Sequence, residues 1–475
     1  MLVALGFLMI ATFMALIMTK RMTPLLALII VPTVFGLFAG AGLGIGDMVM
    51  DSVKSMSGTA AMLMFAIMYF GIMIDVGLFD KLVDGILKIV GNDPAKVVMG
   101  TALLTGLISL DGDGSTTFIV VTAALLPIYL RIGMSPVVLT CVAGLTNGTM
   151  NIVPWGGPTA RAAAALHVDS SDIFVPMIPA LAAGLIAVFL FAWAMGLSER
   201  KRLQLEDPLR WGTGSVMNAS GGSPKGSKTP KAPTGGGLGT AVLERVATRG
   251  DGSEAATMDG TVLDPTRETL RPKMYWFNLA MTVAIMVLLV VDIVPMAYLF
   301  MVGTAIALVV NFPKISDQAK MIASHASSVI AVVSMVLAAA VLTGVLSGTG
   351  MVEAMSAWLV DVIPSSMGPL LAVLTGIISI PATFFMSNDA FYFGILPVLT
   401  EAGAHYGIDA VDMARASITG QPVHMQSPLV PAILLLVSLA KVDLGDHHKK
   451  VLWRAVVVSL VMLTAGILTG AIAIG

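Results

Sequence analysis

The heptapeptide LTGLISL at residues 104–110 returns 270 residues later as LTGIISI at residues 374–380. Five of the seven positions are identical, and the other two exchange leucine for isoleucine. Further pairs keep nearly the same separation along the chain: Pro24 with Pro295, Gly71 with Gly344, Gly133 with Gly407, and Pro154 with Pro428. Any single pair could align by chance in a sequence built from few apolar residue types. The ordered set favours two copies of one structural unit.

Both copies are unusually apolar. Of the 475 residues, 56% are hydrophobic and 12% are charged, about half the charged share of a soluble domain. The formal net charge of −2 excludes a nucleic-acid binder that works by bulk positive charge, and the high hydrophobicity excludes a disordered chain. A single cysteine, Cys141, excludes a disulfide framework and a multi-cysteine metal site. We therefore predict an all-α polytopic membrane protein.

Charged residues collect between the two copies. Of the 27 basic and 29 acidic residues, 21 fall within 199–273, which also contains the Gly- and Pro-rich stretch GGSPKGSKTP at 221–230. Such a composition is typical of a flexible, solvated linker. The chain is therefore predicted to consist of an N-terminal transmembrane repeat (1–198), a flexible cytoplasmic connector (199–273) and a C-terminal transmembrane repeat (274–475).

Each copy contains apolar windows long enough to cross a membrane. They lie at 2–18, 23–43, 57–78, 134–166 and 173–197 in the first copy, and at 274–291, 293–311, 321–346, 410–440 and 451–474 in the second. Two further apolar segments, 95–130 and 366–403, are interrupted near the middle and are predicted to be re-entrant hairpins. The windows 134–166 and 410–440 contain Pro- and Gly-rich breaks. Each repeat thus has about five crossings, one re-entrant hairpin and one broken helix.

An odd number of crossings turns the second repeat upside down relative to the first. With the turn at Lys20 and Arg21 in the cytoplasm, all but three of the 27 basic residues fall on that side, as the positive-inside rule requires. The exceptions are Lys54, Arg161 and Arg415. Both termini are then predicted to lie outside. Inverted repeats with interrupted helices are typical of secondary transporters, because they expose one site alternately on each side of the membrane.

Polar residues at membrane depth mark a site or a pathway by default, and the tip of the first hairpin reads DGDGSTT from Asp111. Asp111 and Asp113 are candidates to contact a cation or to carry protons, and Ser115 and Thr116 are candidate substrate ligands. The pattern resembles the start of an EF-hand loop, but Thr122 stands where that loop needs glutamate. The alternative is a solvated loop outside the membrane.

The tip of the second hairpin offers hydroxyl, amide and carboxylate groups in succession. Ser387 and Asn388 are candidate substrate ligands, and Asp389 is a candidate for proton or metal coupling. Ser, Asn and Asp are also the residues that cap helix N-termini, so a capping role is the alternative interpretation.

The break in the first broken helix, NIVPWGGPTAR at 151–161, cannot continue as a helix. Its freed backbone groups must face protein, water or ligand. The candidate substrate-binding residues there are Asn151, Gly156, Gly157, Thr159 and Arg161. Arginine binds carboxylates bidentately, although Arg161 could instead extend to the membrane interface.

The counterpart break in the second broken helix contains Gln421, His424 and Ser427. Gln421 and Ser427 are candidate substrate ligands. His424 is a candidate proton carrier, although a lone buried histidine is more often a hydrogen-bonded structural residue. Hydrolase, dinucleotide-binding and Walker motifs are absent from the sequence, so neither an enzyme nor an ATP-driven pump is expected.

Several long motifs resemble those of the citrate–divalent metal:proton symporter family (CitMHS) of bacteria. The resemblance covers nearly the whole chain outside the connector and is specific at the segments 17–21, 69–80, 109–114, 151–161, 387–394 and 420–424. It implies uptake of citrate complexed with a divalent metal of the Mg²⁺ or Ca²⁺ class, in symport with protons, across the inner (plasma) membrane.

The resemblance further implies a homodimer with an elevator-like carrying domain. Asp111, Asp113 and Asp389 would meet the metal only through the substrate complex, so no resident cofactor is expected. The expected partners are the citrate–metal complex, protons and the lipid bilayer, with no nucleic acid. The alternatives are a sodium-coupled di- or tricarboxylate carrier or another ion antiporter of the same fold, and a passive anion channel.

Overall fold

The computed structural model describes residues 1–19, 21–91, 93–112, 114–206, 267–291, 293–364 and 366–473. Every regular element in these ranges is a helix, which confirms the predicted all-α class. Eight helical segments among the described residues are long and apolar enough to cross a membrane, and shorter apolar helices accompany them. The chain is therefore a polytopic membrane protein.

The first copy consists of spanning helices, an amphipathic helix, a hairpin and a broken helix. In chain order these are α1 (Leu2–Met18), α2 (Pro24–Phe38), α3 (Ile45–Asp75), α4 (Asp80–Val90), the hairpin α5 (Pro94–Ile108) and α6 (Gly114–Ile132), the broken pair α7 (Pro136–Met150) and α8 (Gly157–Leu166), the short α9 (Ser170–Phe174), and α10 (Ile178–Glu206). The hairpin begins where the sequence caps it, because the Asp93 side chain accepts a hydrogen bond from Ala95 N and Pro94 occupies the first helical position.

The second copy repeats this order of elements. It comprises α13 (Tyr275–Val291), α14 (Met296–Asn311), α15 (Ile315–Ser324), α16 (Ala326–Gly348), α17 (Met351–Val362), α18 (Leu371–Phe385), the π-helical η6 (Ala390–Ile395), α19 (Leu396–Ala404), α20 (Ala410–Ile418), α21 (Gln421–His424), α22 (Pro431–Leu439) and α23 (Leu444–Leu468). Helices are interrupted at both predicted hairpin tips and at both predicted breaks, and the re-entrant course of the hairpins remains an expectation. The inverted relation of the copies stays a prediction.

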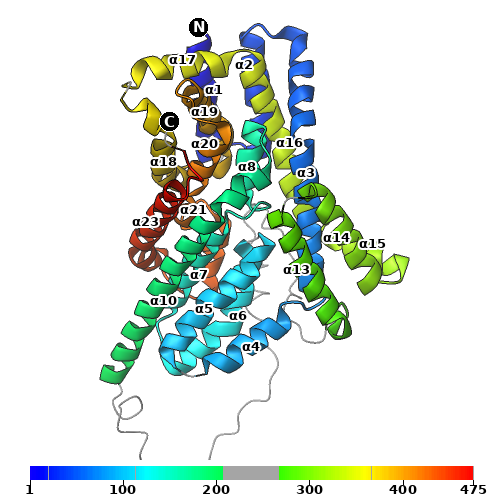
Figure 1. The fold of residues 1–475 in the computed structure, drawn as a ribbon, viewed down its shortest axis with the longest axis vertical. Coiled ribbons are helices and arrows are strands. Elements are labelled where there is room, and N and C mark those ends of the chain that lie inside the picture. The colour runs from blue at the N-terminus through cyan, green and yellow to red at the C-terminus, as the bar shows by residue number, and fades with distance from the viewer. Residues whose placement is uncertain are drawn as a thin grey trace, which may run out of the picture.

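The two hairpins lie at opposite ends of the molecule, α5–α6 at the lower end and α18 with α19 at the upper end in Figure 1. Helices α2, α3, α14 and α16 pack together, whereas α5, α7 and α10 pack with one another and with α23. Helix α7 belongs to the second of these groups, whereas α8 contacts α3 and α16 of the first group and, in addition, α20 and η6. The first broken helix therefore lies where the two groups of helices meet.

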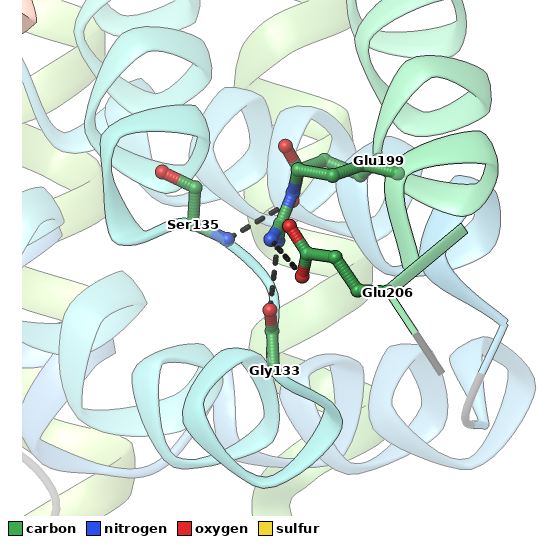
Figure 2. A network of polar contacts seen from close by, with 5 residues as sticks. Gly133, Ser135, Glu199 and Glu206 are labelled. Atoms are coloured by element: carbon green, nitrogen blue, oxygen red, sulfur yellow. Dashed lines mark hydrogen bonds and ion pairs between the residues drawn. The ribbon is translucent and has the colours of Figure 1, made fainter. Parts of the chain in front are cut away.

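The start of the predicted connector at residue 199 comes too early, because α10 continues to Glu206. Arg202 donates to Glu199 (2.8 Å), to Glu206 (2.7 Å) and to the carbonyl of Gly133 (2.8 Å). Figure 2 shows these three partners together with Ser135. Glu199 also accepts a hydrogen bond from the backbone N–H of Ser135 at 3.0 Å. These contacts fix the turn between α6 and α7 against the last turns of α10.

The far end of the predicted connector is also packed. The Arg267 side chain is buried and forms an ion pair with Asp80 of α4 at 2.8 Å, while its Nε donates to the carbonyl of Asp75, the last residue of α3 (3.0 Å). The Thr269 hydroxyl donates to the same carbonyl. Arg267 thus caps the C-terminal end of α3, whose final carbonyls have no partner within the helix. The stretch 207–266 lies outside the described residues.

Candidate functional site

The first broken helix is interrupted between Met150, where α7 ends, and Gly157, where α8 begins. Gly156 is required there, because a Cβ atom at this position would lie 2.3 Å from the carbonyl oxygen of Asn151. The hydroxyl of Thr159 donates to the carbonyl of Ile152 at 2.8 Å and so satisfies one of the freed backbone groups. Asn151 follows the last residue of α7, and its side chain donates to Gln421 of the second break.

Trp155, in the same break, connects three parts of the molecule. Its indole N–H donates to the carbonyl of Leu110 at the tip of the first hairpin (2.8 Å). Its ring packs against Phe70 of α3 and Phe300 of α14, with centroids 5.0 Å and 5.2 Å away. The contact with the hairpin tip is not apparent from the sequence.

The second break is closed by its own polar side chains. Nδ1 of His424 lies 2.6 Å from the carbonyl of Thr383, and the hydroxyl of Ser427 donates to the carbonyl of Phe384 at 2.6 Å. Both carbonyls belong to the last turn of α18, where helical partners are missing. Because a carbonyl only accepts, Nδ1 of His424 carries a hydrogen. The Ser427 hydroxyl, predicted to bind substrate, is used instead to hold the backbone.

The tip of the second hairpin, between α18 and η6, combines a cap with two polar side chains that contact other parts of the molecule. The hydroxyl of Ser387 accepts a hydrogen bond from Ala390 N at 3.2 Å, which is the capping role left open by the sequence. The π-helical turn of η6 follows directly, and such turns are frequent at functional sites. Asn388 and Asp389, both mostly buried, are the side chains of this tip that reach the first copy or the second break.

Gln421 lies at the centre of an amide cluster that joins the two copies. Its Oε1 accepts from Nδ2 of Asn151 at 3.1 Å and of Asn388 at 3.4 Å. Its Nε2 donates to the hydroxyl of Tyr392 at 3.0 Å and to Oδ1 of Asn388 at 3.2 Å. Three of the predicted substrate ligands, from both breaks and the second hairpin, are thus in direct contact.

Arg161 and Asp389 form an ion pair between the copies, with Nε and Oδ1 2.6 Å apart. The side chains are 24% and 10% exposed, so the pair is largely shielded from solvent. Gly157 makes room for the guanidinium, because a Cβ there would lie 2.7 Å from Nη1 of Arg161. This pair contradicts the alternative in which Arg161 extends to the membrane interface.

The tip of the first hairpin is held by the first broken helix. Asp111 is buried in the 3-10 turn η2 (Ser109–Asp111), and Asn147 of α7 donates to the hydroxyl of Ser109 at 2.9 Å. Ser115 and Thr116 lie in the first turn of α6. Asp113, another of the three predicted carboxylates, lies outside the described residues.

Together these residues form a site with several donors and few charges. Arg161, the amides and the N-terminal end of α8 can bind an oxyanion. Among the described residues no group of three or more His, Cys, Asp or Glu side chains is placed to hold a metal ion. A cation bound at Asp389 or Asp111 would therefore need to keep most of its ligands from the substrate or from water.

Sequence reasoning missed Tyr392, whose hydroxyl contacts Gln421 and lies 3.4 Å from the carbonyl of Ser417. A signal was present, since Tyr392 follows Asp389 by three residues and therefore falls one turn later on the same face. Asn147, at the start of the polar cluster that precedes the first break, was not among the predicted ligands, and its contact is with Ser109 of the hairpin tip.

Comparison with known proteins agrees with a transport site. The sequence model of the citrate transporter family, CitMHS, matches residues 2–420. A citrate transporter of Bacillus subtilis (strain 168) is 47% identical over 472 residues, which are 99% of this chain and 100% of the relative. A Mg²⁺/citrate complex secondary transporter of the same organism is 44% identical over 475 residues, 100% of both chains. These relatives are transporters and not enzymes.

Among solved structures, the YdaH transporter of Alcanivorax borkumensis is similar with a TM-score of 0.53. The match covers 88% of this chain and 86% of that one, at 13% sequence identity. At such an identity the likeness concerns the fold alone. The crystal structure of YdaH was described as revealing an unusual topology.

Proposed function

Because this chain belongs to the CitMHS family of citrate transporters, we propose that it is a secondary transporter for citrate complexed with a divalent metal, in symport with protons. The observation that carries the proposal is the ion pair between Arg161 and Asp389, placed beside the amide cluster of Gln421. It sets a cation and a carboxylate side by side where two interrupted segments from different copies meet.

The charges of the site suit a complex better than free citrate. Citrate alone is a trianion, and its transfer into a shielded site is costly. A divalent metal leaves a complex of about −1, and a proton cancels the remainder. The relative that is 44% identical is named for the Mg²⁺/citrate complex, which supports this substrate class. Magnesium keeps its bound water and demands near-octahedral geometry, whereas calcium accepts more ligands at longer distances. The size of the cavity around the complex therefore decides which ion is preferred.

The site residues divide by chemistry into two proposed groups. The proposed substrate ligands are donors or glycines that let the backbone approach: Ser115, Thr116, Asn151, Gly156, Gly157, Thr159, Arg161, Ser387, Asn388 and Gln421. Ser427, whose hydroxyl donates to the carbonyl of Phe384, is not among them. The proposed proton- or metal-coupling residues are Asp111, Asp113, Asp389 and His424. The protein is proposed to lie in the bacterial plasma membrane as a homodimer, with the connector in the cytoplasm and both termini outside.

Uptake of labelled citrate into proteoliposomes tests this function. We expect uptake to require a divalent ion, offered one at a time, and to follow an inward proton gradient in the absence of Na⁺. Arg161→Ala is expected to lower uptake at least about 100-fold, because it removes the fixed positive charge opposite the substrate. Asp113→Asn is expected to abolish uptake as well, with membrane insertion of both variants unchanged.

Two results would favour the alternatives. Uptake of metal-free citrate driven by a Na⁺ gradient would indicate a sodium-coupled carboxylate carrier. An internal citrate concentration that never exceeds the external one, together with an uptake rate that does not saturate, would indicate a channel.

A further inference from the structure

We propose that Asn147 of α7 recognises the metal half of the transported complex, and that its side-chain oxygen helps to set which divalent ion is preferred. The inference rests on the proposed function, because it concerns which end of a metal–citrate complex faces which part of the same site. It adds a residue that is not among the ligands predicted from the sequence.

The amide group of Asn147 has one partner and one unpartnered atom. Its Nδ2 donates to the hydroxyl of Ser109 in the first hairpin tip at 2.9 Å. Within the part of the chain that the structure describes, its Oδ1 has no hydrogen-bond partner, although the residue is only 5% exposed. A buried acceptor without a donor is costly. Binding of a ligand that brings a hydrogen-bond donor or a cation removes this cost.

A glycine leaves room beside this oxygen. A Cβ atom on Gly114, the first residue of α6, would lie 3.2 Å from Oδ1 of Asn147. The same Cβ would lie 3.2 Å from Cε of Met425 in the second break. The oxygen of Asn147 therefore faces the place where the first hairpin, α7 and the second break come together.

The position of Asn147 on α7 puts it within reach of a ligand bound at the amide cluster. Asn151 follows four residues later at the end of the same helix, so it lies on the same face, about 5.4 Å further along the axis. The side chain of Asn151 donates to Gln421, the centre of that cluster. A tricarboxylate with one end at the amide cluster can therefore present its other end to Asn147.

The chemistry of the two ends decides which of them faces Asn147. An amide oxygen only accepts hydrogen bonds, and so does an ionised carboxylate, so the carboxylates of citrate suit Arg161 and not this oxygen. A bound metal ion brings positive charge and water molecules, whose hydrogens need acceptors. Among the described residues no group of three or more His, Cys, Asp or Glu side chains is placed to replace that water. The oxygen of Asn147 accepts a hydrogen bond from a water molecule on the ion.

Binding of Mg²⁺–citrate and of Ca²⁺–citrate to the purified, full-length protein tests the inference. Asn147→Leu removes the acceptor. Water on Mg²⁺ is held in near-octahedral positions, whereas the coordination shell of Ca²⁺ adapts, so the Mg²⁺ complex should lose more affinity. We expect the ratio of the Kd for the Mg²⁺ complex to the Kd for the Ca²⁺ complex to rise at least about tenfold over the wild-type ratio. Asn147→Asp keeps an oxygen at this position and should leave the ratio within about threefold of the wild-type value.

Two further variants separate recognition from folding. Asn278→Leu is the matched control, because Asn278 and Asn311 join α13 to α14 through two reciprocal hydrogen bonds of 2.9 Å. Its loss should lower the melting temperature and leave the ratio of the two Kd values unchanged. Gly114→Ala keeps Asn147 but puts a methyl group beside Oδ1. It should shift the ratio in the same direction as Asn147→Leu by at least about threefold, and it replaces that variant if Asn147→Leu is not monodisperse.

The hydroxyl of citrate is the other donor that could reach Oδ1 of Asn147, and tricarballylate, which lacks this hydroxyl, distinguishes the two. If Asn147→Leu abolishes the preference for citrate over tricarballylate and leaves the metal ratio unchanged, Asn147 recognises the hydroxyl and the inference is wrong.

An unchanged metal ratio in Asn147→Leu, or in Gly114→Ala where that variant replaces it, also overturns the inference. So does an Asn147→Asp protein whose ratio shifts as far as that of Asn147→Leu, because the oxygen would then be unimportant. If the wild-type protein binds neither complex, the proposed function fails instead. The two failures are therefore distinguishable.

Discussion

The two broken helices have similar interruptions in sequence but use their polar residues differently. In the first, the break is closed by backbone geometry and by Thr159, and Arg161 in the following helix is directed at the second copy. In the second, His424 and Ser427 are used to satisfy the last carbonyls of α18. Gln421 contacts Asn151 of the first break, and Gln426 donates to the carbonyl of Gly144 in α7.

This difference teaches that a polar residue within a membrane span is not by itself a ligand. An interrupted helix leaves carbonyl and N–H groups that must be satisfied, and nearby hydroxyl and imidazole groups are used for this purpose first. The residues left over after that requirement, Arg161 and Gln421, are the stronger candidates for substrate contact. The comparison predicts effects of very different size for substitutions in the two breaks.

The largest effect is expected for Gly156→Ala. Its Cβ would lie 2.3 Å from the carbonyl oxygen of Asn151 and 2.8 Å from that of Val153, so the break must change shape and Arg161 must move. We expect citrate uptake to fall at least about 100-fold, as for a misplaced charged ligand. Gly58→Ala in α3 is the control, because a Cβ there meets no atom within 4 Å. Wild-type uptake by Gly156→Ala would show that the shape of the first break is unimportant.

A smaller effect is expected for Gln421→Ala, which removes the centre of the amide cluster. Asn151 and Asn388 then lose a partner, at a cost of about 1–3 kcal/mol per buried group left unsatisfied. We expect KM for citrate uptake to rise about 10- to 100-fold with modest loss of maximal rate.

Gln426→Ala, in the same break, separates substrate contact from packing. Gln426 donates to the carbonyls of Gly144 and Pro422 and contacts His447, all away from the amide cluster. This variant should lower the melting temperature and leave KM near the wild-type value. Equal KM values for the two variants would argue against a special position of Gln421.

Much of the fold follows from the sequence for identifiable reasons. Hairpin and broken-helix positions were predictable because clusters of Pro and Gly disfavour a continuous helix and because the repeat gave each element a counterpart. The start of α5 was predictable from Asp93 and Pro94. The ends of the connector were not predictable from the sequence. The last residues of α10 have the composition of a linker, but ion pairs such as that between Arg202 and Glu206 stabilise them as a helix.

The residues of the candidate site were predictable from the sequence, but the contacts among them were not. Arg161, Asn388, Asp389 and Gln421 were all identified from polar residues at breaks. Which of them touch depends on how the two copies are packed, and this information is spread over apolar contacts that carry no motif. For the same reason the sequence does not show that the Ser427 hydroxyl binds the carbonyl of Phe384, whereas Gln421 contacts the first copy.

The smallest effect is expected for Ser427→Ala. Loss of one hydrogen bond to the carbonyl of Phe384 should cost about 1 kcal/mol of stability, visible as a lower melting temperature of the purified protein. KM for citrate should not change, because the hydroxyl is engaged with the backbone. A rise in KM of tenfold or more would restore Ser427 as a substrate ligand and weaken the contrast between the two breaks.

The contacts of Arg267 and Thr269 with the end of α3 concern assembly of the molecule. Both residues follow the stretch 207–266, so they belong to any polypeptide that begins at Arg267. Such a polypeptide carries its own recognition surface for the partner fragment that ends at Glu206. The two parts of the chain are thus joined by a specific interface as well as by a covalent link.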